Sequence, residues 1–190
     1  MMAEINKNIF KSFPEFDSDR LHFRKINFVD ANDIFFIRSN DDVMRFMDVP
    51  RHYSITDSEK LIQSIIESYK NETGITWGII EKQSNEFIGY IGFIRMTSEH
   101  CRAEIGYVLK PAYWGKGFMY ESINKIVRFG LGEMNLHSIE ANVNPLNDKS
   151  LKVLEKIGFI KEAYFRENYL FNGKFLDSVI YSLLEKDLQE

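Results

Sequence analysis

Apolar and polar residues follow two different periods along this 190-residue chain. Alternating or β-branched-rich runs, which are typical of strands, predict seven strands at residues 21–25, 75–81, 87–96, 102–109, 137–143, 159–168 and 175–184. Apolar residues spaced three and four apart, which are typical of one helix face, predict four helices at residues 30–39, 57–71, 116–132 and 147–157. The order β-α-α-β-β-β-α-β-α-β-β predicts a mixed α/β domain in which helices cover the faces of one sheet.

Turn and cap residues mark the ends of several elements. Thr56 with Glu59 three residues later predicts a capping box at the second helix. Gly130 and Gly132 predict that the third helix unwinds there, and the dipeptide at 172–173, Asn-Gly, predicts a terminal hairpin. Because a helix separates residues 102–109 from the next strand, these two strands can lie parallel at the centre of the sheet.

The stretch from residue 107 to residue 121 joins a strand end, a glycine turn and a helix start. Pro111 ends the strand ladder because it has no N–H to donate, and Gly115 and Gly117 open the helical pattern that follows. Such a turn leaves backbone N–H groups unpaired at the positive end of a helix. It predicts an anion site suited to a pyrophosphate. A turn that merely closes a strand-to-helix connection is the alternative.

Length, charge and cysteine content exclude several classes. The length predicts one domain at residues 19–190 after an N-terminal extension at 1–18. With 24 basic against 28 acidic residues there is no basic field for direct nucleic-acid binding. One cysteine and four scattered histidines predict neither an internal disulfide nor a metal site. No apolar run or signal segment is evident, so we expect a cytoplasmic protein without a membrane partner.

Three residues of the glycine turn stand at the defining positions of a known pattern. Trp114, Gly117 and Met119 align with Gln/Arg-x-x-Gly-x-Gly/Ala, and the stretch resembles the acetyl-CoA loop of the GNAT acyltransferases in its RimJ/RimL-like form, Trp-Gly-Lys-Gly-Phe. Residues 140–159, with Asn-Val-Asn-Pro-Leu-Asn-Asp-Lys-Ser and Leu-Glu-Lys-Ile-Gly-Phe, are similar to the second motif of that branch. The segment from Asp177 resembles its last strand. The resemblance covers residues 19–188.

The resemblance implies a GNAT fold with acetyl-CoA as cosubstrate and no metal. The expected fold has a central mixed, mostly antiparallel sheet of about seven strands, flanking helices and a splay between two parallel central strands. The residues implied to bind the cosubstrate are Val108, Leu109, Gly115, Lys116, Gly117, Phe118, Met119, Asn142, Asn144 and Asn147. Asn147 would bond the pantetheine arm, although Asn is also a preferred N-cap where a helix begins.

Amide formation from a thioester needs a neutral amine, a stabilised oxyanion and a proton for the departing thiolate. The resemblance implies Glu104, in Ala-Glu-Ile, as the general base. The alternative is that Glu104 is an exposed strand residue without a catalytic role. The other candidate bases are Glu162, Glu167 and Asp177.

The same resemblance implies an acid and an oxyanion donor. Many members have an acid tyrosine where this chain has Leu154, so Ser150 is implied as the acid. A serine in a first helical turn can instead cap or back-bond the helix. The backbone amide of Leu109 is the expected oxyanion donor.

The implied activity is acetyl-CoA-dependent N-acetylation of a primary amine, with a ribosomal-protein-like N-terminal α-amine as the expected acceptor. A polyamine or aminoglycoside acetyltransferase and a non-catalytic acyl-CoA-binding protein are the alternatives. The phosphate-loop pattern Gly-x-x-x-x-Gly-Lys-Ser/Thr is absent, which disfavours phosphoryl transfer. Specificity is expected from residues 46–53 and 165–175, and both a monomer and a homodimer are compatible with the sequence.

Overall fold

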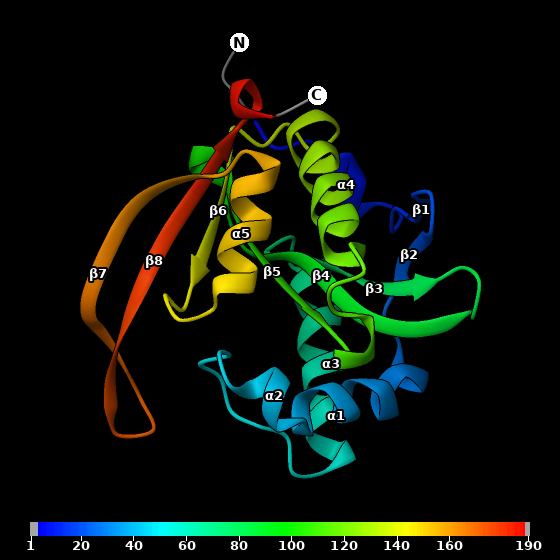
Figure 1. Cartoon of the computed structure of the whole chain (residues 1–190). Coiled ribbons are helices and arrows are strands. Elements are labelled where there is room, and N and C mark those ends of the chain that lie inside the picture. The colour runs from blue at the N-terminus through cyan, green and yellow to red at the C-terminus, as the bar shows by residue number, and fades with distance from the viewer. Residues whose placement is uncertain (1–3, 189–190) are drawn as a thin grey trace.

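An eight-stranded sheet in the order β1-β2-β3-β4-β5-β6-β8-β7 runs through the computed structural model, which describes residues 4–188 (Figure 1). Its strands are β1 (Phe16–Asp17), β2 (Leu21–Lys25), β3 (Ile75–Glu81), β4 (Glu86–Thr97), β5 (Arg102–Leu109), β6 (Ser138–Val143), β7 (Ile160–Phe171) and β8 (Lys174–Leu184). Among the strands that the structure describes, only β5 and β6 are parallel neighbours, and all other neighbouring pairs are antiparallel. The predicted mixed, mostly antiparallel sheet is therefore confirmed, and the two-residue strand β1 is an addition that the sequence pattern did not predict.

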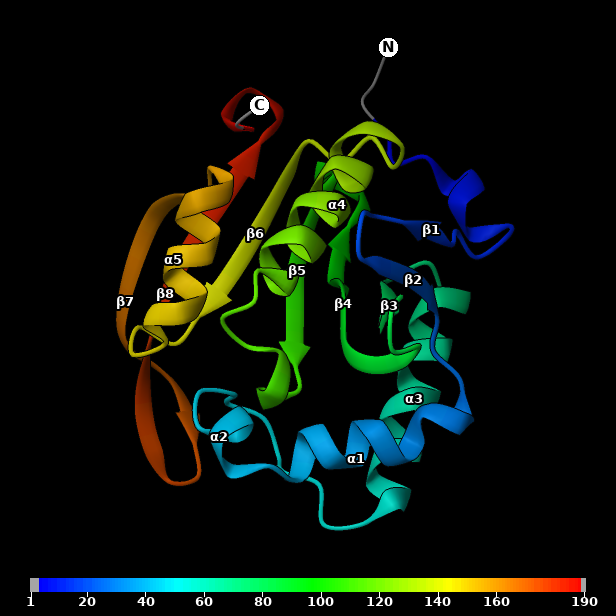
Figure 2. The same ribbon diagram turned by 45° about the vertical axis from the view of Figure 1, so that its right-hand side comes forward.

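Within residues 4–188, five α-helices flank the sheet. They are α1 (Ala31–Ser39), α2 (Asp41–Met44), α3 (Ile55–Lys70), α4 (Phe118–Gly132) and α5 (Asp148–Ile157). The apolar sides of α4 and α5 pack into one large core cluster with strands β3 to β6 and β8. Residues of α1 and α3 form a second, smaller cluster with Ile80, Phe87 and Val108. The sheet therefore has a helical layer with its own apolar core on each face (Figure 2).

Two predictions about helix ends are wrong. The capping box of α3 pairs Ser54 with Asp57, two residues before the predicted pair, because Ser54 has the extended backbone that an N-cap requires. The predicted end of this helix at Gly132 is confirmed, but Gly130 lies inside α4 and does not unwind it. A Cβ at Gly130 would lie 2.5 Å from the Phe93 Cζ atom, so this glycine serves close packing of α4 on the sheet.

The two parallel strands separate soon after they pair. Their register joins only residues 102–104 of β5 to residues 138–140 of β6. Beyond that point β5 stays on β4 as far as Leu109, and β6 stays on β8 as far as Val143. We call the resulting gap between residues 105–109 and 141–144 the wedge. Figure 2 shows the carboxyl ends of β5 and β6 diverging above α1 and α2, which confirms the predicted splay.

The described part of the predicted N-terminal extension packs against the sheet. Ile5 is buried in the large core cluster, and Phe16 pairs in β1 with Phe23 of β2. The rings of Phe13 and Phe16 lie 5.9 and 5.5 Å from the Trp77 ring. Among residues 4–188, no helix is long and apolar enough to cross a membrane.

Candidate active site

The glycine loop between β5 and α4 presents a run of free backbone donors. Gly115 and Gly117 have φ angles of +71° and +80°, which favour glycine, and α4 begins directly afterwards at Phe118. Within the described chain, the N–H groups of residues 115–120 have no hydrogen-bond acceptor, and the first bonded amide is that of Glu121, 3.1 Å from the Gly117 oxygen. A Cβ on Gly115 would meet nothing within 4 Å. These open amides at a helix N-terminus can bind an anion.

Side chains on both sides of the loop fix its position. The Trp114 indole Nε1 donates to the Leu109 oxygen at 2.9 Å, which ties the loop to the end of β5. The Lys149 ammonium lies 4.9 Å from the centre of the Trp114 ring. Lys116, expected beside the anion, has its ammonium 5.4 Å from the centre of the Tyr113 ring. Within the loop's helical turn, Phe118 is buried and Met119 is partly buried against the large core.

Backbone alternation decides which amides of β5 face the wedge. The Lys110 amide donates to the Ile88 oxygen of β4 at 2.8 Å. Because backbone groups in a strand point alternately to its two edges, Val108 also points its amide toward β4, whereas Leu109 points its amide toward the wedge. Across the gap, Asn142 pairs with Ile180 of β8. The Leu109 amide is therefore the free donor at the end of this edge of β5.

The far side of the wedge ends in two asparagines. The Asn144 Oδ1 accepts from the Leu146 amide at 3.0 Å, and its Nδ2 lies 3.5 Å from the Asp48 carboxylate. Asn147 is the N-cap of α5, where its Oδ1 accepts from the Ser150 amide at 3.3 Å. The capping role of Asn147 occupies only its oxygen. Its Nδ2 group makes no hydrogen bond within residues 4–188.

Two hydroxyls meet on the α5 face of the sheet. The Ser150 Oγ and the Tyr107 Oη are 2.6 Å apart, and Ser150 is only 9% exposed. Burial raises the pKa of Tyr107, although its hydrogen bond with Ser150 opposes the shift, so the phenol stays protonated at neutral pH. Leu154, at the position where the resemblance would place an acid tyrosine, is fully buried in the core. A hydroxyl pair thus stands where the sequence predicts a single hydroxyl.

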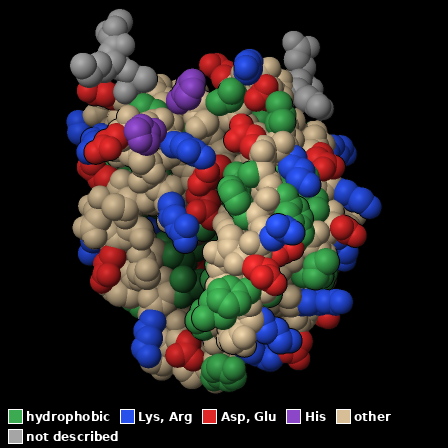
Figure 3. All heavy atoms as spheres, turned by 90° about the vertical axis from the view of Figure 1, so that its left-hand side faces the viewer, with side chains coloured by type: hydrophobic (Ala, Val, Ile, Leu, Met, Phe, Trp, Pro, Cys, Tyr) green, Lys and Arg blue, Asp and Glu red, His purple; other side chains and the backbone are tan. Residues whose placement is uncertain are grey.

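Glu104 lines a cavity of about 140 Å³ on the opposite face, together with Arg95, Thr97, His100, Arg102, Ala103 and Glu140. Its Oε2 lies 3.3 Å from the Arg95 Nη1, and its Cα is paired with that of Glu140, which forms an ion pair with Arg102. Burial raises the pKa of Glu104; the Arg95 charge lowers it and the Glu140 charge raises it further. In Figure 3 acidic and basic side chains gather around a hollow in this side of the molecule. A carboxylate with a raised pKa in an accessible cavity suits a general base.

The other candidate bases lie on the β7–β8 hairpin. Asp177 accepts hydrogen bonds from the Tyr164 hydroxyl, at 2.5 Å, and from the Glu167 amide, at 2.7 Å. Glu162 and Glu167 are exposed. Among residues 4–188 there is no group of three His, Cys, Asp or Glu side chains that could hold a metal ion.

Three features of the site have no local signal in the sequence. Arg20 contacts the glycine loop from a distance of 96 residues along the chain. Tyr107 and Ser150 are 43 residues apart, and the Asp48 carboxylate accepts a hydrogen bond from Tyr169, 121 residues away. Each contact depends on how distant elements pack, which a local pattern does not encode.

A loop with free amides suited to a diphosphate lies beside a wedge between two parallel strands, and a carboxylate and two hydroxyls flank the wedge. This arrangement is that of an N-acetyltransferase, one class of acyltransferase. The chain belongs to the GNAT family: residues 20–160 match the family model described as the Acetyltransferase (GNAT) domain. The predicted family and enzyme class are therefore confirmed.

Relatives and solved structures agree with this family. The chain is 38% identical to the uncharacterized N-acetyltransferase YoaA of Bacillus subtilis over 91% of this chain and 98% of YoaA. The crystal structure of ribosomal-protein-S5-alanine acetyltransferase from Vibrio fischeri superimposes with a TM-score of 0.80 at 25% identity, over 93% of this chain and all of that one, in line with the RimJ/RimL-like branch. The structure of spermidine N-acetyltransferase from Vibrio cholerae in complex with CoA and spermine shares the fold, with a TM-score of 0.79 at 24% identity over 90% and 98% of the two chains.

Proposed function

We propose that this enzyme transfers the acetyl group of acetyl-CoA directly to a primary amine, and that the acceptor is the N-terminal α-amine of a protein. The observation that carries the proposal is the joining of the free amides at 115–120 to a wedge that opens at the same end of the sheet. The loop supplies donors for a diphosphate, and the wedge supplies unpaired strand edges for an extended arm with amide groups. A CoA thioester has both parts.

The chain's own groups divide the binding task. The amides of residues 115–120 hold the diphosphate, and the Asn147 Nδ2 donates to the pantetheine arm. The Leu109 amide points into the wedge and donates to the carbonyl oxygen of the thioester, where negative charge develops during attack. A backbone donor held by a strand needs no reorganisation when the charge appears.

The proton transfers fall to Glu104 and Ser150. The amine nitrogen attacks the thioester carbon and gives its proton to the Glu104 carboxylate. The C–S bond then breaks with its electron pair on sulfur, and the Ser150 hydroxyl donates a proton to that thiolate. Solvent returns a proton to Ser150, and Glu104 releases the amine proton to solvent, so both groups are restored. Tyr107, whose hydroxyl is 2.6 Å from the Ser150 Oγ, supports this donation by its hydrogen bond.

The acceptor class is supported by acid–base energetics and by one relative. An α-amine with a pKa near 8 is neutral about one time in ten at pH 7, whereas a lysine amine is neutral about once in 2,500, a cost of roughly 4.6 kcal/mol. One carboxylate with a raised pKa is a sufficient base for the easier acceptor. The Vibrio fischeri relative is a ribosomal-protein-S5-alanine acetyltransferase, which acts on a protein.

A polyamine is the second candidate acceptor. The cavity beside the wedge contains two carboxylates, those of Glu104 and Glu140, which attract cations. The Vibrio cholerae structure is that of a spermidine N-acetyltransferase. Arg95 and Arg102 pair with the two carboxylates, which weakens the attraction and places this candidate second.

The test is incubation of the purified enzyme with isotope-labelled acetyl-CoA and three kinds of acceptor: ribosomal-protein N-terminal peptides, the same peptides with a blocked α-amine, and spermidine. We expect label on the free α-amine, stoichiometric release of CoA, and no label on the blocked peptides. Label on spermidine alone would show that the acceptor is a polyamine and not a protein α-amine. Binding of acetyl-CoA without CoA release in every arm would identify a non-catalytic acyl-CoA-binding protein instead.

A further inference from the structure

Arg20, the residue before β2, makes one hydrogen bond to the glycine loop and two to Glu121 of α4. Its Nη1 donates to the Lys116 oxygen at 2.9 Å, and its Nε donates to the Glu121 Oε2 at 2.7 Å. Its own backbone amide donates to the Glu121 Oε1 at 2.8 Å. The guanidinium also lies 4.3 Å from the centre of the Phe118 ring. One side chain therefore contacts the loop, the first helical residue and the first-turn carboxylate of α4.

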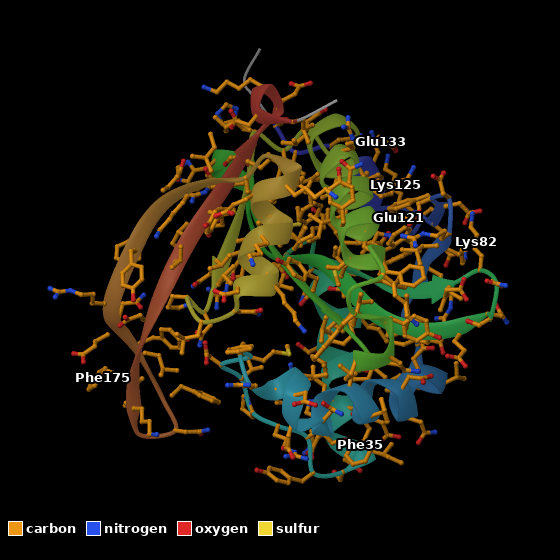
Figure 4. The ribbon with its side chains drawn as sticks, viewed as in Figure 1. Phe35, Lys82, Glu121, Lys125, Glu133 and Phe175 are labelled. Atoms are coloured by element: carbon orange, nitrogen blue, oxygen red, sulfur yellow. The ribbon has the colours of Figure 1, made fainter. Side chains whose placement is uncertain are left out.

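Glu121 creates an electrostatic problem that Arg20 solves. A carboxylate in the first turn of a helix is drawn to the same free amides and positive dipole end that would bind a diphosphate. Burial alone would raise the pKa of Glu121, but hydrogen bonds from Ser18 and Arg20 and the Arg20 charge lower it overall, so the group is ionised at neutral pH. Figure 4 shows Glu121 on the side of α4 that faces β1 and β2, where Arg20 and Ser18 hold it.

The Lys116 carbonyl creates a similar problem. A peptide oxygen that turned toward the free amides of the loop would present negative partial charge to a bound phosphate. The bond from the Arg20 Nη1 fixes this oxygen toward β2. A Cβ at Gly117 would stand 3.4 Å from the Arg20 Nη2, so the glycine is needed for its φ of +80° and not for the approach of Arg20.

We infer that Arg20 is a positioning residue of the diphosphate site. It neutralises Glu121, holds that carboxylate away from the amides of residues 115–120, and turns the Lys116 carbonyl away from the bound anion. The inference rests on the proposed function, because it takes CoA as the ligand of the loop. Arg20 acts on the ligand through Glu121 and the loop, not through a contact of its own.

The test compares four variants by calorimetric titration with CoA and by steady-state kinetics. Arg20→Met should weaken CoA binding about tenfold, because it leaves a partly buried carboxylate uncompensated beside the anion. Glu121→Gln alone should bind CoA as the wild type does. The double variant Arg20→Met/Glu121→Gln should recover most of the loss, since the repelling charge is gone. In Arg20→Met the KM for acetyl-CoA should rise, while kcat at saturation should change by less than about threefold, because uniform binding is lost.

Arg24→Met is the matched control. It removes a different arginine–carboxylate pair, that of Arg24 with Asp30 at 2.6 Å. Among residues 4–188, Arg24 makes no hydrogen bond or ion pair with the glycine loop, so this variant should bind CoA normally. Thermal melting of every variant separates loss of affinity from loss of folding.

Each outcome decides between the proposals. Wild-type affinity in Arg20→Met would overturn the inference and leave the proposed function standing. Equally weak CoA binding in Arg20→Met and in the double variant would also overturn the inference. That result would mean that Arg20 only supports the structure of the loop and does not compensate the charge of Glu121. Absence of CoA binding in the wild type would overturn the proposed function itself.

Discussion

The two faces of the sheet at the wedge are built from opposite kinds of side chain. On the α5 face two neutral hydroxyls, those of Tyr107 and Ser150, meet at 2.6 Å beside a large apolar core. On the other face Glu104 and Glu140 share a cavity with two arginines. Strand β5 supplies one residue to each face: Glu104 and Tyr107 are three positions apart, and side chains alternate between the two faces along a strand.

This difference separates the two proton transfers of the proposed reaction. A base must release the proton that it takes, so the cavity around Glu104, which is lined by charged side chains, suits removal of the amine proton. A thiolate leaving into an apolar layer gains more from a nearby neutral donor, because electrostatic interactions are stronger where water is excluded. The contrast assigns the acceptor to the charged face and the leaving sulfur to the hydroxyl face. The predictions below test that assignment, beginning with the largest effect.

Glu104→Gln should abolish the contribution of the charged face. We expect kcat to fall about 100- to 1,000-fold with little change in the KM for acetyl-CoA, because a general base supplies a rate factor of this order. Measurement is by CoA release at pH 7 with the accepted amine. Glu59→Gln, at an exposed position on α3, is the matched control and should keep wild-type activity.

The thermal stability of Glu104→Gln tests whether its loss of activity is only a loss of folding. The pKa of Glu104 is raised by burial, so the folded state disfavours its ionised form. A group with a raised pKa contributes to folding stability at low pH, and this contribution is lost as the pH rises through the pKa of the folded state. At pH 7 the carboxyl group of Glu104 therefore lowers the stability of the wild type in a way that a glutamine does not. The melting temperature of the variant at pH 7 should not fall. An inactive variant that melts clearly lower would count against a catalytic role.

Ser150→Ala tests the hydroxyl face and should have the second largest effect. We expect kcat to fall about 10- to 100-fold, because an acid is lost while water can partly replace it. The loss should shrink with acetyl thioesters of more acidic thiols, whose thiolates leave without a proton. A loss that is independent of the thiol would contradict the assignment of Ser150 to the leaving group.

The sequence predicted the framework of this site better than its details. All seven strands of the pattern are present, and the turn glycines Gly115 and Gly117 have the positive φ angles that such a turn needs. These features depend on local backbone chemistry, which a short segment records. The predicted roles of Glu104 and Ser150 stay predictions.

The failures have a common physical cause. Ser54 with Asp57 and Thr56 with Glu59 both have the spacing of a capping box, and only the backbone of the folded chain distinguishes them. A glycine such as Gly130 is typical of a helix end, but here the glycine is needed because the Phe93 ring packs against it. The bond between Arg20 and Glu121 joins residues 101 apart. Contacts of this kind arise only when distant elements pack together.

Arg95→Met should shift the pH dependence of the charged face. The Arg95 charge lowers the pKa of Glu104 against the effects of burial and Glu140, so its removal should raise that pKa further. The base must be ionised to act, and the acidic limb of the kcat/KM profile should therefore move to higher pH. Activity should be reduced on the acidic side of the profile and be restored as the pH rises. An unshifted profile would show that the ion pair at 3.3 Å does not act on the base.

Tyr107→Phe should have the smallest effect and is the sharpest test of the hydroxyl pair. The raised pKa of Tyr107 keeps its phenol protonated, and in the proposed mechanism that phenol donates to the Ser150 Oγ and leaves the serine proton free for sulfur. Loss of this one neutral hydrogen bond corresponds to about 1 kcal/mol, or roughly a fivefold lower kcat. In the Ser150→Ala background the same substitution should change kcat very little, because Tyr107 then has no serine through which to act. Equal effects in both backgrounds would mean that Tyr107 supports the reaction by packing alone, and the two faces would then differ in charge without differing in chemical role.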